Sequence, residues 1–239
     1  AAWVALGGPP GGLGYDIRYD FSDFNRWYVT DDFAGIFFSD DRGLTWSSSN
    51  QGLHVLDGDL GFRVADFCAT VDPHNPSTVW TGLDLVGHVY KSTNRGATWV
   101  AMENGITPQA GQSFRGFTVH PATADIVYLA SELASDVFIQ EGTRPPGTRG
   151  KGGRVYRTSD GGRNWNVIWE GDALARYIWI APDDPNRIYV STGFFDREPM
   201  NLPAEPTADN MGGLGVLRST DGGRSWTVLG KERGLGHLY

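Results

Sequence analysis

The sequence predicts an all-β protein, a β-propeller of four-stranded antiparallel blades, and three observations carry this prediction. A phrase of the form Ser/Thr-x-Asp/Asn-x-Gly-x-x-Trp occurs four times in 239 residues. A second marker, an aromatic residue followed by small or β-branched residues, precedes each copy. Glycine is abundant at 33 residues and aromatic residues make up 13% of the chain, which favours strands joined by tight turns. The four copies of the phrase span residues 39–46, 92–99, 158–165 and 219–226.

Each repeat unit reads as four strands in a fixed order. The first strands are expected near residues 15–19, 65–71, 116–119 and 177–180. The second strands contain the marker residues Tyr28, Trp80, Tyr128 and Tyr189. The third strands include residues 36–39, 88–91, 154–157 and 215–218, and each fourth strand begins at the tryptophan of the phrase.

Radial repetition of such units is typical of a propeller, in which each blade covers the face of its neighbour. The alternatives are a β-sandwich and a β-solenoid. A sandwich would not repeat one turn phrase at a constant place, and a solenoid usually has shorter repeats.

The repeat units define one propeller domain, or part of one. Residues 3–6 resemble the fourth strand of a blade whose beginning is absent, so missing blades or a partner chain could complete the ring. The units cover about residues 12–53, 63–103, 114–169 and 177–229, and residues 1–8 and 230–239 belong to further blades or to closure.

The repeated phrase has a mechanical explanation. The hydroxyl and carboxylate side chains can hydrogen bond to the backbone of a tight turn, and glycine adopts a conformation that a side chain would hinder. The phrase resembles the Asp-box, or BNR repeat, of sialidases, two-propeller xyloglucanases, the sortilin luminal domain and a photosystem II assembly factor. This resemblance implies a propeller and leaves the activity open. Unit two departs from it with Asn94, and unit three with Asn164.

Composition excludes several classes of function. The net charge of −8 argues against nucleic acid as a partner, because phosphates demand a basic surface. The sequence contains no run of about 20 apolar residues, so it predicts no membrane-spanning segment. Cys68 is the single cysteine, so the chain has no internal disulfide, and the five histidines lack metal-ligand spacing. We expect no metal and no cofactor. No signal peptide is visible, although the family resemblance implies a secreted protein, extracellular or periplasmic.

Loop lengths indicate which end of the blades carries function. In an antiparallel blade, loops between strands two and three open at the end opposite the repeated phrase. From marker to phrase tryptophan the distance is 18 and 19 residues in units one and two, and 37 in units three and four. Long loops on a rigid scaffold often bind ligands, or else serve as mobile or assembly arms. The insert in unit four contains the candidate ligand-binding residues Phe194, Phe195 and Asp196, and Phe33 lies at the same predicted end.

Two aspartates occupy one aligned position at that end. Residues 32–35 read Asp-Phe-Ala-Gly and residues 84–87 read Asp-Leu-Val-Gly. This is similar to the Asp-x-Gly-Gly phrase that carries the catalytic aspartates of two-propeller xyloglucanases, with the first glycine missing. Glycoside hydrolysis needs two carboxylates about 5–9.5 Å apart. Asp32 and Asp84 are therefore candidate catalytic residues, and a turn-forming role is the alternative for each.

Arginines in or next to the first strands form a second candidate group. They could form a ring that attracts an anionic ligand, or pair with carboxylates across the channel. Sialidase activity is not favoured, because the Arg-Ile-Pro phrase of that family is absent. The four residues are Arg18, Arg63, Arg115 and Arg176.

Two functions follow from these observations. The preferred hypothesis is a non-catalytic recognition or assembly propeller that binds a glycan or a protein on its loop-rich face. The alternative is a glycoside hydrolase of the xyloglucanase kind, or a fragment of one, that acts on β-glucan with paired carboxylates.

Overall fold

The structure is a computed structural model that describes residues 7–9, 14–54, 64, 66–83, 86–106, 112–133, 153–171, 175–192 and 215–230. In this part of the chain the strands form four sheets, each of four antiparallel strands in sequence order. The described residues contain no helix long and apolar enough to span a membrane. Each sheet corresponds to one repeat unit, and we refer to the sheets as blades 1 to 4.

The chain divides into two compact units. Unit 1 comprises Ala1–Asp84 and His88–Met102, and unit 2 comprises Leu85–Gly87 and Glu103–Tyr239. Blades 1 and 2 belong to unit 1. Their strands are β1 (Gly14–Asp20), β2 (Asp23–Asp31), β3 (Gly35–Ser39) and β4 (Ser47–Ser48), then β5 (Asp66–Val71), β6 (Val79–Leu83), β7 (Val89–Ser92) and β8 (Val100–Ala101).

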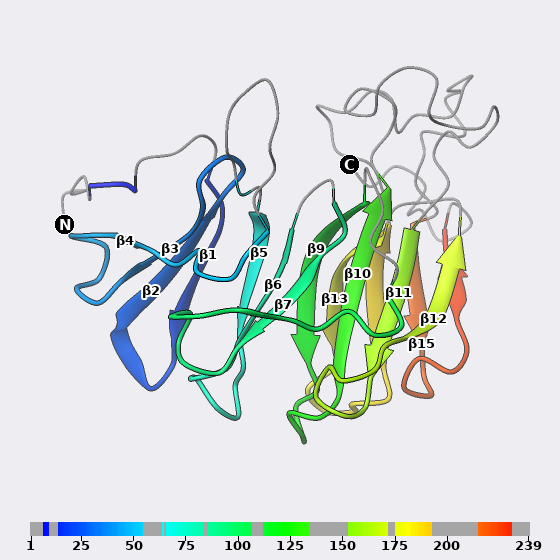
Figure 1. The fold of residues 1–239 in the computed structure, drawn as a ribbon. Coiled ribbons are helices and arrows are strands. Elements are labelled where there is room, and N and C mark those ends of the chain that lie inside the picture. The colour runs from blue at the N-terminus through cyan, green and yellow to red at the C-terminus, as the bar shows by residue number, and fades with distance from the viewer. Residues whose placement is uncertain are drawn as a thin grey trace, which may run out of the picture. The chain divides into compact units, whose positions relative to one another are not determined.

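Blades 3 and 4 belong to unit 2, and Figure 1 draws the ribbon of their strands in colours from green to red. Their strands are β9 (Gln112–Val119), β10 (Val127–Leu133), β11 (Gly153–Thr158) and β12 (Asn166–Gly171), then β13 (Ala175–Ile180), β14 (Ile188–Thr192), β15 (Val216–Ser219) and β16 (Thr227–Leu229). The third strands match their predicted bounds to within one residue. The fourth strands begin one residue after the phrase tryptophan, and β9 begins four residues earlier than predicted.

The repeated phrase forms the turn between the third and fourth strand of every blade. In blade 1, the Ser39 hydroxyl accepts the Gly43 N–H at 2.7 Å, and Asp41 accepts the Thr45 N–H at 2.8 Å and its hydroxyl at 2.6 Å. Asn94 replaces the aspartate in blade 2 and still accepts the Thr98 N–H at 2.9 Å. The phrase therefore folds locally, as its residue types predict.

The phrase tryptophans hold neighbouring blades together. Trp99 of blade 2 donates its indole N–H to the Ser49 carbonyl, just beyond β4 of blade 1, at 2.6 Å. Trp226 of blade 4 makes the same contact with the Ile168 carbonyl on β12 of blade 3, at 3.0 Å. The sequence suggests an anchor for the turn, whereas the structure shows that this anchor lies on the outermost strand region of the preceding blade.

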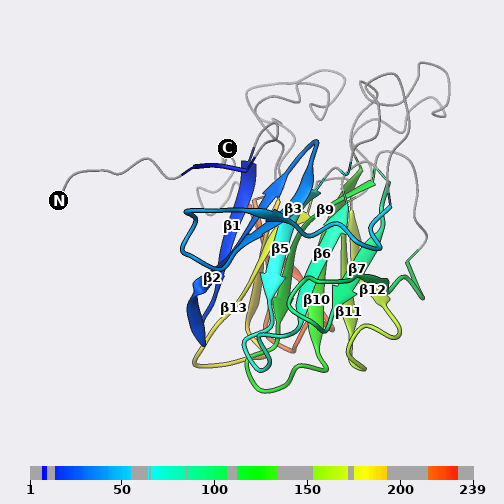
Figure 2. The ribbon, with the colours of Figure 1, turned by 60° about the vertical axis from the view of Figure 1, so that its left-hand side comes forward.

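Within each unit, the core lies between the two blades. The first strands β1 and β5 pack side by side in unit 1, as Figures 1 and 2 both show. In unit 2, blade 3 presents Tyr128, Ala130 and Val155 to the apolar face of blade 4. That face consists of Ala175, Ile178, Ile180, Ile188, Val190 and Leu217.

Candidate functional site

The candidate site lies at the blade end where the first strands begin and the second strands finish. Antiparallel pairing places Gly14, at the start of β1, opposite Asp31, at the end of β2. The turn that follows, residues 32–34, contains Asp32 and Phe33. Asp32 is half-buried, and Phe33 is 42% exposed. A carboxylate residue and an aromatic residue thus follow one another in the turn at this end of blade 1.

Asp31 holds this turn from within. It is buried, and its Oδ1 accepts the N–H groups of Phe33 and Ala34, both at 2.9 Å. The sequence analysis identified Asp32 as a candidate catalytic residue and did not identify Asp31. An aspartate that precedes a turn commonly accepts backbone N–H groups two or three residues later, and this tendency was the available signal.

Asn50 holds the turn from the outside. Its side-chain amide donates to the Ala34 carbonyl at 2.7 Å, and its Oδ1 accepts the Ile36 N–H at 2.8 Å. Gly35 has a φ of 79°, and a Cβ at this position would lie 2.4 Å from the Asn50 Oδ1. The glycine that the two candidate phrases share is therefore required by the turn and its neighbour. The result is a fixed backbone under Asp32.

The second candidate aspartate, Asp84, lies outside the described residues. So do Arg63, Phe194, Phe195 and Asp196. The separation of Asp32 from Asp84 remains a prediction. Gly87, the last residue of the second phrase, has a φ of 70° and matches Gly35 in conformation.

A β-bulge interrupts the first strand of every blade near this end. The irregularities follow Gly14 in β1 and Asp66 in β5, lie opposite Ala130 and Ser131 in β9, and follow Ala175 in β13. Bulges redirect side chains at the ends of sheets. In every blade, the marker aromatic of the second strand pairs with one residue of the first strand. The residue three positions before that partner lies in the bulge. These equivalent residues are Tyr15, Phe67, Arg115 and Arg176.

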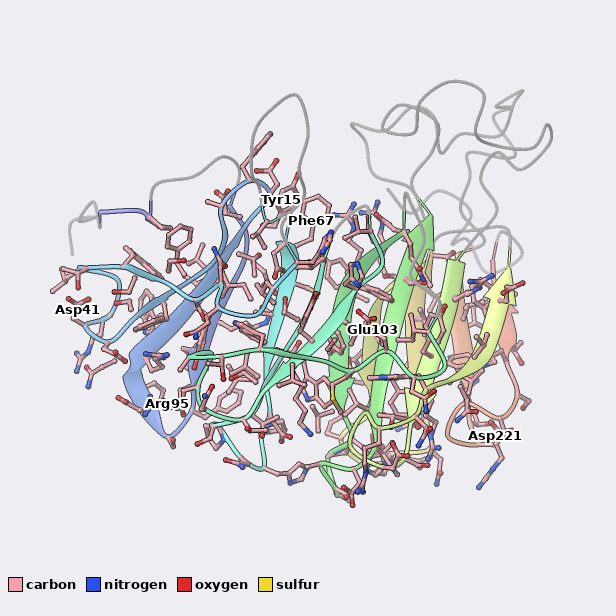
Figure 3. All side chains as sticks on the ribbon, in the orientation of Figure 1. Tyr15, Asp41, Phe67, Arg95, Glu103 and Asp221 are labelled. Carbon is pink, nitrogen blue, oxygen red and sulfur yellow. The ribbon has the colours of Figure 1, made fainter. Side chains whose placement is uncertain are left out.

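In unit 1 this position carries two aromatic rings. The centroids of Tyr15 and Phe67 lie 4.1 Å apart, and the ring planes make an angle of 50°. Figure 3 shows the two side chains together at the starts of β1 and β5, whereas Arg95 lies at the opposite end of the sheets. Both rings are half-buried. Sequence reasoning missed this pair, because the bulge that aligns the residues is not visible in the sequence.

In unit 2 the same position carries arginines. Arg115 and Arg176 both form ion pairs with Glu132, which is fully buried, and the Arg176 contact measures 3.1 Å. Glu132 follows its marker Tyr128 by four residues, as Asp32 follows Tyr28, so the two carboxylates are equivalent in register. Of the two roles considered for these arginines, pairing with a carboxylate is the one observed. Anion binding by them remains a prediction.

Arg18 differs from the other two described arginines. It lies three positions beyond the bulge, its side chain is 47% exposed, and it pairs with Asp16 at 2.8 Å. Burial raises the pKa of Asp16, and Arg18 partly opposes this shift. Asp16 also accepts the Ala69 N–H at 3.3 Å, which links β1 to β5.

Asp66 is a further carboxylate at this end that the sequence did not single out. It is fully buried at the start of β5. It accepts the Cys68 N–H at 3.0 Å and the Thr81 hydroxyl at 2.5 Å, so it ties β5 to β6. Among the described residues, no group of three or more His, Cys, Asp or Glu side chains could hold a metal ion.

Comparison with known proteins finds glycoside hydrolases among those similar to this chain. No family model matches the chain. The chain is 26% identical over 253 residues to the xyloglucanase Xgh74A of Acetivibrio thermocellus. The alignment covers 97% of this chain and 27% of the relative, so the chain spans about a quarter of the length of the curated relatives it matches.

Solved structures of GH74 enzymes share the fold. An ancestral GH74 enzyme superposes with a TM-score of 0.65 at 20% identity, over 96% of this chain and 26% of the other. The GH74 enzyme of Niastella koreensis gives a TM-score of 0.60 at 23% identity, over 89% of this chain and 28% of the other. The chain has the β-propeller fold of the GH74 enzymes.

A third solved structure agrees. The GH74 xyloglucanase of Xanthomonas campestris gives a TM-score of 0.58 at 16% identity, over 89% of this chain and 29% of the other. The homologues of this propeller are glycoside hydrolases, which favours the hydrolase hypothesis over the recognition hypothesis.

Proposed function

We propose that this propeller is part of a secreted glycoside hydrolase that cleaves β-glucan of the xyloglucan class, and that Asp32 supplies one of its catalytic carboxylates. The observation that carries the proposal is the turn of blade 1. Asp31 and Asn50 fix its backbone on both sides, and the turn contains the half-buried Asp32, followed by the exposed Phe33. Fixed geometry is what a catalytic group requires, because misplacement of a reacting atom by about 1 Å can cost 10²-fold in rate.

The comparisons support the substrate class. The curated relatives are named xyloglucanases, and the similarity extends over nearly the whole chain. The four repeated turns would then be Asp-boxes that support the scaffold. Aromatic rings are suited to stacking on sugar rings, and Tyr15, Phe67 and Phe33 are the described candidates at this end.

A second carboxylate is needed for hydrolysis, since one group protonates the leaving oxygen and the other acts as base or nucleophile. We assign this role to Asp84, which occupies the position of Asp32 in the adjacent blade's sequence. Glu132 holds the equivalent position in blade 3, but it forms ion pairs with two arginines, so we assign it a structural role. Glu132 is therefore not our candidate for the second group.

The test measures release of reducing ends from xyloglucan by the complete gene-encoded protein. Asp32→Asn and Asp84→Asn should each lower kcat by about 10²–10⁴-fold, the usual contribution of a general acid or base. Asp183→Asn is the matched control, because Asp183 is an exposed carboxylate paired with Arg187 in the β13–β14 hairpin. Activity that survives in both variants would refute the assignment. Tight binding of xyloglucan without hydrolysis by the wild type would instead establish the recognition function.

Asp31 is a positioning residue in this scheme. Asp31→Ala removes the acceptor of two backbone N–H groups and should lower kcat more than it raises KM. Asp31→Asn retains an acceptor oxygen and should restore most of the activity. If Asp31→Asn is as impaired as Asp31→Ala, the carboxylate has a role other than holding the turn.

A further inference from the structure

Two histidines of unit 1 lie side by side. His54 belongs to the connection between β4 and β5, which joins blade 1 to blade 2, and His88 directly precedes β7. Their imidazole rings are 4.8 Å apart, centroid to centroid, and the ring planes make an angle of 39°. The spacing of the histidines along the sequence predicts no metal site, but the fold brings together two that are distant in the chain.

Hydrogen bonds of the backbone hold both histidines in place. The His54 N–H donates to the hydroxyl oxygen of Tyr90 at 3.1 Å, and the preceding residue, Leu53, is buried. The His88 carbonyl accepts the Leu83 N–H at 2.9 Å. Tyr90 is itself buried on β7, and its ring centroid lies 6.2 Å from that of His88. A ligand of the two imidazoles would therefore order little more than their side chains, which favours binding.

The repeat does not require a histidine at position 88. His88 lies three residues before Lys91, the residue of β7 that pairs with the marker aromatic of blade 2. The same register position carries Gly35 in blade 1, Arg154 in blade 3 and Gly215 in blade 4. A role particular to this junction therefore explains the histidine better than a role in building every blade.

The separation of the two rings agrees with a shared metal ion. Zn–N bonds are about 2.0–2.1 Å long, and the centre of an imidazole lies roughly 1 Å behind the bonded nitrogen, so two rings on one tetrahedral ion have centres about 5 Å apart. The observed separation is 4.8 Å. Imidazole nitrogen is a ligand that suits Zn²⁺ and Cu²⁺. His54 is exposed, so water can reach the other coordination positions.

We propose that His54 and His88 together bind a divalent transition-metal ion that prefers nitrogen ligands, such as Zn²⁺ or Cu²⁺, and that the bound ion ties the connection between blades 1 and 2 to β7. This site goes beyond the proposed hydrolytic function and does not depend on it. The net charge of −8 favours a cation as the ligand.

The affinity should be lower than that of a structural zinc site. Such a site has four protein ligands. Among the described residues, no third His, Cys, Asp or Glu side chain joins the pair as a possible ligand. An ion that binds the folded chain and not the unfolded one still raises its stability, by an amount that grows with the ratio of free ion to Kd.

Calorimetric titration of untagged residues 1–239 with Zn²⁺ tests the proposal. His54→Ala and His88→Ala should each weaken the binding of Zn²⁺ by about tenfold or more, because each removes one of the two ligands. His74→Ala is the matched control and should bind as the wild type does, because His74 is an exposed histidine of the same unit, in the turn between β5 and β6. Equal binding by His54→Ala and the wild type would overturn the proposal.

Chemical modification of the wild type keeps the proposal testable if His88→Ala fails to fold. Diethyl pyrocarbonate modifies accessible imidazoles, and mass spectrometry locates the products. Zn²⁺ should slow the modification of His54 and His88 and leave that of His74 unchanged. Modification of His54 at the same rate with and without Zn²⁺ would overturn the proposal, even if the ion binds elsewhere.

The proposed tie between the connection and β7 has its own readout. Saturating Zn²⁺ should raise the urea midpoint of the wild type and of His74→Ala, and should leave that of His54→Ala unchanged. An equal rise in the wild type and His54→Ala would contradict the tie. None of these measurements depends on hydrolysis, so their failure and the failure of the proposed function are distinguishable.

Discussion

Removal of the Glu132 carboxylate should destabilise unit 2 more than removal of any exposed carboxylate. Glu132 is fully buried and pairs with Arg115 on β9 and Arg176 on β13, so one side chain connects two blades. Breaking a buried ion pair by deleting one partner costs about 3–5 kcal/mol, because the remaining charge stays in a poorly solvated place. For proteins of this size, 1 kcal/mol lowers Tm by about 2–4 °C. Glu132→Ala should therefore lower Tm by roughly 6–20 °C.

The assay is thermal and urea unfolding of residues 1–239 followed by tryptophan fluorescence. Glu132→Gln, which keeps the shape and an acceptor oxygen, should fall between wild type and Glu132→Ala. Glu170→Ala is the control, because Glu170 pairs with Arg154 but its side chain is 58% exposed, and such a pair contributes about 0–1 kcal/mol. If Glu132→Ala shifts Tm no further than Glu170→Ala, the ion pair does not hold these blades together.

Two further predictions concern the repeated turns. Hydrogen bonds from Ser225 and Ser219 lower the pKa of Asp221 to about 2 from 3.8, so its ionised form stabilises the fold above about pH 4 and this contribution is lost as the pH falls toward 2. Asp221→Asn, the residue that blade 2 carries naturally at position 94, should reduce the drop in urea midpoint between pH 5 and pH 3; an unchanged drop contradicts this explanation. Trp99→Phe removes the donor to the buried Ser49 carbonyl and should cost about 1–3 kcal/mol in urea unfolding, and a loss below about 0.5 kcal/mol would show that the bond is dispensable.

Several features of the fold could be predicted from the sequence because they depend on residues close together in the chain. The turn phrase closes hydrogen bonds over two to four residues, as between Ser39, Asp41 and Thr45. Strand order followed from the spacing of the phrase and the marker aromatics. The third strands needed no correction beyond one residue.

The candidate site was only partly predictable, because it depends on contacts between residues that are far apart in the chain. Asp32 could be identified because residues 32–35 resemble a known phrase. Asp31, which fixes the turn, lies outside that phrase and was not identified. The bulges that bring Tyr15 against Phe67 depend on how two first strands pack, 52 residues apart in the chain. No local pattern encodes that alignment.

The sequence by itself determined the repeat, the strand order and the end of each blade where the chemistry is expected, since periodicity and turn-forming residues act locally. Only the tertiary structure decided that the phrase tryptophans bind the preceding blade, and that Glu132 is enclosed by Arg115 and Arg176 while its register equivalent Asp32 lies on a half-exposed turn. The physical reason is burial. The same position in the repeat carries a buried, ion-paired carboxylate in blade 3 and a carboxylate on a half-exposed turn in blade 1. Which of the two forms depends on the side chains that the neighbouring blade brings against it, and that neighbour lies tens of residues away in the chain.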